Sequence, residues 1–245
     1  MVSHICSLKS WLKHMNPNVA YFPFGRKATI HQFIKQFQQK ATKQNTSKEQ
    51  TIIIFGVARG GTTMAARVIR SLGIELGEGS NINYEDDRFN LQKLGMNPYK
   101  DQESLTRHFL QTIEQRNTEH TNWGWKYPNA SAYLPLIIDK IRNPRLVCIL
   151  RDPLASSSRE QRANVINQNR NEERTLLRSI RAIQTNIELI HQTKTPTFLC
   201  SYEKAINSPS HFVRSLSHFL GIHSNSETLA DAIAQIQTDG YIKNS

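Results

Sequence analysis

The chain has 245 residues, with 31 Lys and Arg against 20 Asp and Glu, which gives a formal net charge of +11. This length fits one domain with a full core, and the basic excess favours an anionic partner: a phosphate-bearing nucleotide, an acidic glycan, a nucleic acid or an anionic membrane surface. The three cysteines lack a Cys-x-x-Cys spacing, which argues against a disulfide framework and a zinc site. No apolar run is long enough for a membrane span and the first residues make a poor signal peptide, so we expect a cytoplasmic chain.

Residues 1–50 are predicted to form a basic helical extension that ends in a polar linker. This extension either packs as an accessory layer on the main domain or contacts an anionic membrane surface. Its second predicted helix starts at about Thr29 and has apolar residues at helical spacing: Ile30, Phe33, Ile34 and Phe37.

A buried strand that runs into a glycine loop is the most informative feature of the sequence. Thr51–Phe55 is an apolar run typical of a strand, and Gly56 and Gly61 occupy the glycine positions of the nucleotide-binding pattern Gly-x-x-x-x-Gly-Lys-Ser/Thr. Thr62 stands where a kinase or ATPase has its lysine, and the cation lies inside the loop instead, at Arg59. The loop therefore lacks the lysine that reaches the β- and γ-phosphates in those enzymes.

Such a loop can still bind one terminal anionic group at the positive end of the helix that follows. The anion would be held by the Arg59 side chain, by the hydroxyl groups of Thr62 and Thr63, and by the amides of Gly60, Gly61, Thr62 and Thr63. An incidental Gly-Gly turn between a strand and a helix is the alternative.

The remaining patterns alternate between helices and strands. We therefore predict a single α/β domain over residues 51–245, P-loop-like, with a central, mainly parallel sheet flanked by helices and with ligands at the carboxyl ends of the strands. The predicted elements are a helix over 64–72 ended by Gly73, an acid-rich loop over 80–95, helices over 104–116, 132–141 (interrupted by Pro135) and 172–191, and strands over 145–150 and 197–200.

Several segments resemble, in order and spacing, the sulfotransferase superfamily, whose sulfuryl donor is 3′-phosphoadenosine 5′-phosphosulfate (PAPS). The resemblance covers about Thr51 to Ile222. It rests on five segments: Arg59-Gly-Gly-Thr-Thr63, Trp123-Gly-Trp-Lys-Tyr-Pro128, Arg145 to Arg159 with its Arg-Asp-Pro, Ser201-Tyr-Glu-Lys204, and Phe212 to Ile222.

The resemblance implies that Arg59 and the residues Gly60 to Thr63 bind the phosphosulfate and that Lys126 neutralises the bridging oxygen as it departs. It implies that Arg151 anchors the 3′-phosphate. The family's serine, eight residues after that arginine, falls here on Arg159, so either Ser158 or Arg159 makes the second contact.

Other residues in these segments have structural interpretations. Asp152 would cap the helix that Pro153 opens. Glu203 would support the edge of the sheet without a catalytic role. Core packing is the default for Trp123 and Trp125, although either could stack on adenine or a sugar.

The general base is expected in the acidic stretch Asn83-Tyr-Glu-Asp-Asp-Arg-Phe89. Carbohydrate and protein-tyrosine sulfotransferases commonly use a glutamate shortly after the phosphosulfate loop, so Glu85 is the first candidate and Asp86 the second. A solvated acidic turn is the alternative, and the histidines are interpreted as surface or packing residues.

The sequence thus predicts a PAPS-dependent sulfotransferase that needs no metal and acts on a hydroxyl group of a carbohydrate or a glycosylated metabolite. Nucleic acid is not among the expected partners. The alternatives are a P-loop kinase-like phosphotransferase and a non-catalytic nucleotide-binding module. Lys126 argues against the latter because a binder has no need of it.

Overall fold

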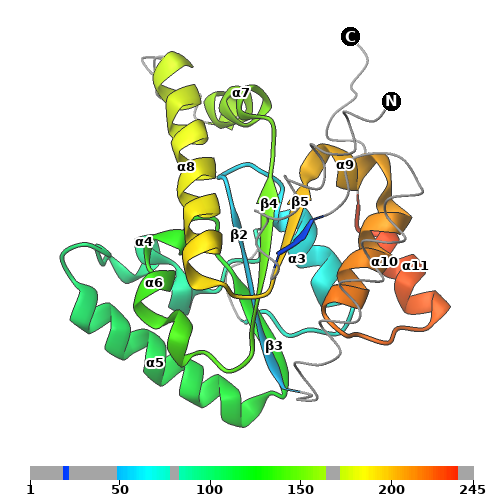
Figure 1. Cartoon of the computed structure of the whole chain (residues 1–245), viewed down its shortest axis with the longest axis horizontal. Coiled ribbons are helices and arrows are strands. Elements are labelled where there is room, and N and C mark those ends of the chain that lie inside the picture. The colour runs from blue at the N-terminus through cyan, green and yellow to red at the C-terminus, as the bar shows by residue number, and fades with distance from the viewer. Residues whose placement is uncertain (1–18, 22–48, 78–82, 164–171, 237–245) are drawn as a thin grey trace, which may run out of the picture.

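The computed structural model describes residues 19–21, 49–77, 83–163 and 172–236 (Figure 1). A parallel sheet lies at its centre, with strand order β1-β5-β4-β2-β3. The mainly parallel sheet predicted from the sequence is therefore confirmed. The strands are β1 (Val19–Tyr21), β2 (Gln50–Gly56), β3 (Asn122–Lys126), β4 (Pro144–Leu150) and β5 (Thr197–Ser201).

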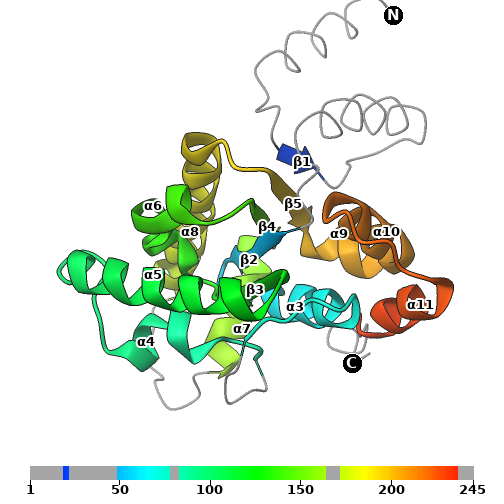
Figure 2. The ribbon, with the colours of Figure 1, turned by 90° about the horizontal axis from the view of Figure 1, so that it is seen from below.

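Helices cover both faces of the sheet (Figures 1 and 2). On one face pack α3 (Thr62–Ser71), α9 (Tyr202–Asn207), α10 (Pro209–Phe219) and α11 (Ser226–Ala234). On the other pack α5 (Gln102–Glu119), α6 (Leu134–Ile137) and α8 (Glu172–Thr193). The remaining helical elements are α7 (Pro153–Ala163), the short α4 (Leu91–Leu94) and the 3-10 turns η1 (Asp87–Phe89), η2 (Ala130–Ala132) and η3 (Ile138–Lys140).

The central strand β2 explains the two-layered core. Ile52 and Ile54 belong to the hydrophobic cluster on the α3 side, whereas Ile53 and Phe55 belong to the cluster on the α5 side. All four side chains are fully buried. A continuous apolar run is what a parallel strand covered on both faces requires.

Several helix predictions are confirmed. The helix expected over 64–72 is α3, and Gly73 follows it with a positive φ of 88°, as a helix terminator does. Pro135 lies in the first turn of α6, within a broken run of short helical turns. The long amphipathic helix is α8.

Two strands were not predicted. β3 was expected only as part of a motif. Within the predicted helical extension, residues 19–21 form the strand β1, which pairs with β5. The helix predicted from Thr29 lies outside the described residues. In the part of the chain that the structure describes, no helix is long and apolar enough to cross a membrane.

Candidate functional site

The glycine loop follows β2 and leads into α3, and its glycines are required by close neighbours. A Cβ atom on Gly56 would lie 2.3 Å from the carbonyl oxygen of Ile149 on β4. Gly61, the N-cap of α3, has a φ of 98°, and a Cβ there would lie 2.1 Å from Cδ2 of Tyr202. Any side chain at these two positions would push the loop away from the strand ends that hold it.

The loop can offer backbone amides and the exposed side chain of Arg59 to an anion. The Gly60 amide donates a hydrogen bond to the Val57 carbonyl (2.8 Å), so it is used inside the loop, contrary to the expectation that it faces a ligand. The amides of Thr62 and Thr63 open α3, where the first N–H groups of a helix have no carbonyl partner within the helix. Arg59 is exposed and has a φ of 60°, in the left-handed region.

Lys126 lies at the end of β3, in register with Ile54 on β2, two residues before the loop begins. Its side chain is only 2% exposed, and Nζ donates to Oε1 of Glu85 (2.8 Å) and to the Asn83 carbonyl (3.0 Å). Burial lowers the pKa of the Lys126 ammonium, the Glu85 carboxylate opposes this effect, and the charge of Arg59 adds to it. The structure therefore brings the three predicted residues Arg59, Glu85 and Lys126 into one electrostatic group.

Glu85 is held at both carboxylate oxygens. Oε1 accepts from Lys126, and Oε2 accepts from Nδ2 of Asn90 at 2.9 Å. The Glu85 side chain remains 23% exposed, so a small molecule can still reach it.

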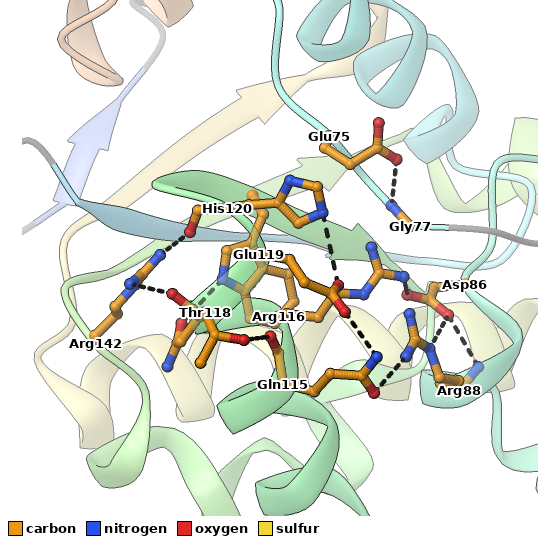
Figure 3. A network of polar contacts seen from close by, with 12 residues as sticks. Glu75, Gly77, Asp86, Arg88, Gln115, Arg116, Thr118, Glu119, His120 and Arg142 are labelled. Atoms are coloured by element: carbon orange, nitrogen blue, oxygen red, sulfur yellow. Dashed lines mark hydrogen bonds and ion pairs between the residues drawn. The ribbon is translucent and has the colours of Figure 1, made fainter.

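Asp86 has a different environment, with a cation of its own (Figure 3). It is fully buried, and its Oδ2 forms an ion pair with Nη2 of Arg116 at 3.0 Å. Its Oδ1 accepts a hydrogen bond from the Arg88 amide, so Asp86 also caps the N-terminus of η1. Burial raises the pKa of Asp86, although Arg116 acts in the opposite direction. This geometry favours Glu85 over Asp86 as the residue that works with Lys126.

Arg151, which follows β4, lies against the loop from the other side. Its side chain is 3% exposed, Nη1 donates to the Arg59 carbonyl (2.8 Å), and its guanidinium lies 4.7 Å from the ring centre of Tyr202. It thus supports the loop backbone directly.

Of the serines at the start of α7, Ser158 is exposed. Ser156 and Ser157 are buried, and their hydroxyl groups donate to the carbonyls of Asp152 and Leu154. This leaves Ser158 as the serine that can meet a ligand. The side chain of Arg159 lies outside the described residues.

The structural interpretations of neighbouring residues are confirmed. Asp152 caps α7 by accepting from the amides of Leu154 and Ala155. The Glu203 carboxylate accepts from the Asp152 amide (3.1 Å) and from the Ser201 hydroxyl (2.9 Å), which joins the ends of β4 and β5.

Trp123 and Trp125 are fully buried, as core packing requires. Phe89 stacks on the Trp125 ring with centroids 4.1 Å apart. Among the described residues, no group of three or more His, Cys, Asp and Glu is arranged to hold a metal ion.

Asn90 was missed by the sequence analysis. Its contact with Glu85 depends on a turn that only the fold specifies. An asparagine directly before a short helix-forming run is, however, a recognisable N-cap signal, and Asn90 does cap α4.

A hollow of about 880 Å³ is lined in part by Tyr84 and Arg88, which flank Glu85 in the sequence, whereas Glu85 and Lys126 are not among its lining residues. Side chains of both charge signs and uncharged polar side chains line most of it, and Figure 3 shows several of them joined in a network of polar contacts. The lining residues are Arg70, Glu75, Leu76, Gly77, Tyr84, Arg88, Gln115, Arg116, Glu119 and His120.

No protein-family model matches the sequence. No curated protein matches it either. Solved structures do. Mouse sulfotransferase SULT7A1 complexed with PAP aligns over 84% of this chain and 71% of its own, with a TM-score of 0.51 and 13% identity.

Two further solved structures align less closely. The sulfotransferase domain from the curacin biosynthetic pathway aligns over 75% of this chain and 77% of its own (TM-score 0.49, 13% identity). Shikimate kinase from Bacteroides thetaiotaomicron aligns over 71% and 98% (TM-score 0.46, 13% identity). The likeness to the mouse enzyme identifies the architecture: the chain has the P-loop-like α/β fold of a sulfotransferase.

Proposed function

We propose that the protein is a PAPS-dependent sulfotransferase that transfers a sulfuryl group to an acceptor hydroxyl. The ion pair between the buried Lys126 and the partly exposed Glu85, at the carboxyl end of β3 and beside the glycine loop, is the observation that carries this proposal. A cation and a carboxylate 2.8 Å apart can serve the leaving and the attacking oxygen of one transfer.

The donor would lie across the strand ends with its phosphosulfate in the loop. Arg59 and the amides of Gly61, Thr62 and Thr63 are proposed to bind that group. The 3′-phosphate is proposed to meet Arg151 and a residue of α7, with Ser158 exposed and therefore favoured.

The glycine loop would also connect the two proposed donor contacts, the phosphosulfate site and the 3′-phosphate site. Arg151 donates to the carbonyl of Arg59, so an anchor for one end of the donor supports the loop that binds the other. Losing the Arg151 side chain is therefore expected to weaken binding at both ends.

The chemistry is a direct displacement. The acceptor oxygen attacks sulfur, its proton passes to Glu85, and the bond between sulfur and the bridging oxygen breaks as the new S–O bond forms. Lys126 stabilises the charge on the departing oxygen, which leaves with adenosine 3′,5′-bisphosphate (PAP). Lys126 and Arg59 supply the positive charge for this step, so the proposed transfer needs no metal.

We also propose a carbohydrate, or a metabolite that carries one, as the acceptor. Support comes from the hollow beside the Glu85 segment, which charged side chains of both signs line together with Gln115 and Tyr84. Such a lining suits hydroxyl groups, whereas a steroid or a simple phenol needs a mainly apolar pocket.

The donor assignment is tested by calorimetric titration with PAP and AMP, which differ by the 3′-phosphate. PAP should bind at least about 2 kcal/mol more tightly, or roughly 30-fold, because a charge-assisted phosphate contact is gained. Arg151→Ala should remove most of that difference. Equal affinities of the wild type for PAP and AMP would refute the PAPS assignment, and consumption of ATP with phosphorylation of an acceptor would establish a kinase.

The acceptor class is tested with radiolabelled PAPS and a panel of neutral and acidic disaccharides, with p-nitrophenol and a 3-hydroxysteroid for comparison. Transfer to saccharides should exceed transfer to the other two. Turnover confined to the phenol or the steroid would contradict the carbohydrate proposal and leave the sulfotransferase proposal standing.

A further inference from the structure

Asn90 presents its amide nitrogen to Glu85 in a fixed orientation. Its side-chain oxygen caps α4 by accepting from the amides of Gln92 (3.0 Å) and Lys93 (3.4 Å). Those two contacts identify the oxygen end of the amide, so the nitrogen end is the one that lies 2.9 Å from Oε2 of Glu85. The residue is 6% exposed, which leaves it little room to turn.

The other contact of the Glu85 carboxylate is with a residue that has a second task. Lys126 donates to Oε1 of Glu85 in this structure. In the proposed reaction Lys126 must also stabilise the oxygen that leaves with the nucleotide. Its hold on Glu85 therefore weakens when the donor is bound, whereas the cap of α4 keeps the Asn90 amide in place.

We propose, on the basis of the proposed function, that Asn90 is a positioning residue: it keeps the Glu85 carboxylate aimed at the acceptor once Lys126 engages the donor. The backbone on this side is already held, because the adjacent Asp86 forms a buried ion pair with Arg116. The remaining freedom is the rotation of the Glu85 side chain. The hydrogen bond from Asn90 removes it.

The test separates the contact with Glu85 from the helix cap. Serine at an N-cap retains an oxygen for the helix amides but has no amide nitrogen for Glu85, so Asn90→Ser should fold normally. We expect kcat for the best disaccharide of the panel to fall roughly 10-fold or more, since a slightly misplaced base is inefficient. The dissociation constant for PAP should stay within about 3-fold. Asn90→Asp, with the same shape, places an oxygen that repels Glu85 and should lose more activity.

Asn225→Ser is the matched control. Asn225 caps α11 through its side-chain oxygen, which accepts from the Thr228 amide at 2.8 Å, and it has no part in the proposed site. Its kcat and PAP affinity should equal those of the wild type.

A double-mutant cycle then asks whether Asn90 acts through Glu85. In a Glu85→Gln background the base is already lost, so Asn90→Ser should lower kcat no further. An Asn90→Ser protein with wild-type kcat, or a multiplied loss in the Glu85→Gln background, would overturn the inference.

A crystal structure of Asn90→Ser with PAP bound gives an answer that does not depend on turnover. Glu85 should be turned away from its present position or spread over several rotamers. A Glu85 carboxylate in its present place would overturn the inference. A wild-type protein that binds PAP and transfers sulfuryl to none of the acceptors would instead refute the proposed function.

Discussion

Removing the Glu85 side chain should leave the buried ammonium of Lys126 without its counter-ion. The resulting loss of unfolding free energy can be measured independently of catalysis. In Glu85→Ala, Lys126 keeps the Asn83 carbonyl at 3.0 Å but loses its counter-ion. Breaking one side of a buried ion pair typically costs about 3–5 kcal/mol. Because Glu85 is 23% exposed, water can enter the vacated space, and we expect a loss of about 2–3 kcal/mol. For a chain of this size that corresponds to a melting temperature lower by roughly 4–12 °C.

Two variants make this prediction specific. Glu85→Gln retains an oxygen for Lys126, so its unfolding free energy should fall by less than about 1 kcal/mol while kcat falls by roughly 10²-fold. Glu85→Ala combined with Lys126→Met removes both charges and should regain most of the lost stability. Urea unfolding followed by circular dichroism measures all three. If the loss of unfolding free energy in the double variant equals the sum of the losses in the two single variants, the broken ion pair does not explain the instability of Glu85→Ala.

Three further predictions concern the loop, the pH dependence and metal. Gly61→Ala should abolish PAP binding in calorimetry, since its Cβ would lie 2.1 Å from Cδ2 of Tyr202, whereas Gly73→Ala, which strains a backbone with a φ of 88° but meets no atom within 4 Å, should lose some stability and still bind PAP. Burial lowers the pKa of Lys126, and the proposed reaction needs its charged form, so kcat/KM should decrease with rising pH at a midpoint below 10.5, the ordinary lysine pKa. The same alkaline decrease in the residual activity of Lys126→Met would contradict this assignment. EDTA should leave turnover with PAPS unchanged.

The elements that local patterns specify were predicted well. The strand β2, the loop and α3 are continuous in sequence, and their apolar spacing and glycines are sufficient to identify them. The strand β3 was missed because Trp123-Gly-Trp125 is not a run of branched apolar residues. Gly124 is explained only by the fold, since a Cβ there would lie 2.1 Å from the Ile52 carbonyl of the neighbouring strand.

The contacts inside the site are less accessible to sequence reasoning. Glu85 and Lys126 were both singled out, but their pairing across 41 residues depends on how the 83–90 segment returns to the end of β3. The partner of Asp86 is equally hidden from local patterns. The sequence makes Asp86 the second candidate after Glu85, and the fold pairs it with Arg116, 30 residues away. Local sequence patterns do not distinguish the adjacent carboxylates of Glu85 and Asp86. The structure does, because Asp86 is fully buried and Glu85 is 23% exposed.

The order of the strands divides the site into two flanks. β2 lies between β3, which ends in Lys126, and β4, which leads to Arg151, so the two cations stand on opposite sides of the central strand. The hollow and Glu85 belong to the β3 flank, whereas α7 belongs to the β4 flank. If the proposed function holds, substitutions on the β3 flank would change which acceptor is used while the proposed nucleotide contacts on the β4 flank stay the same, and a library confined to the hollow is the natural starting point for redesign.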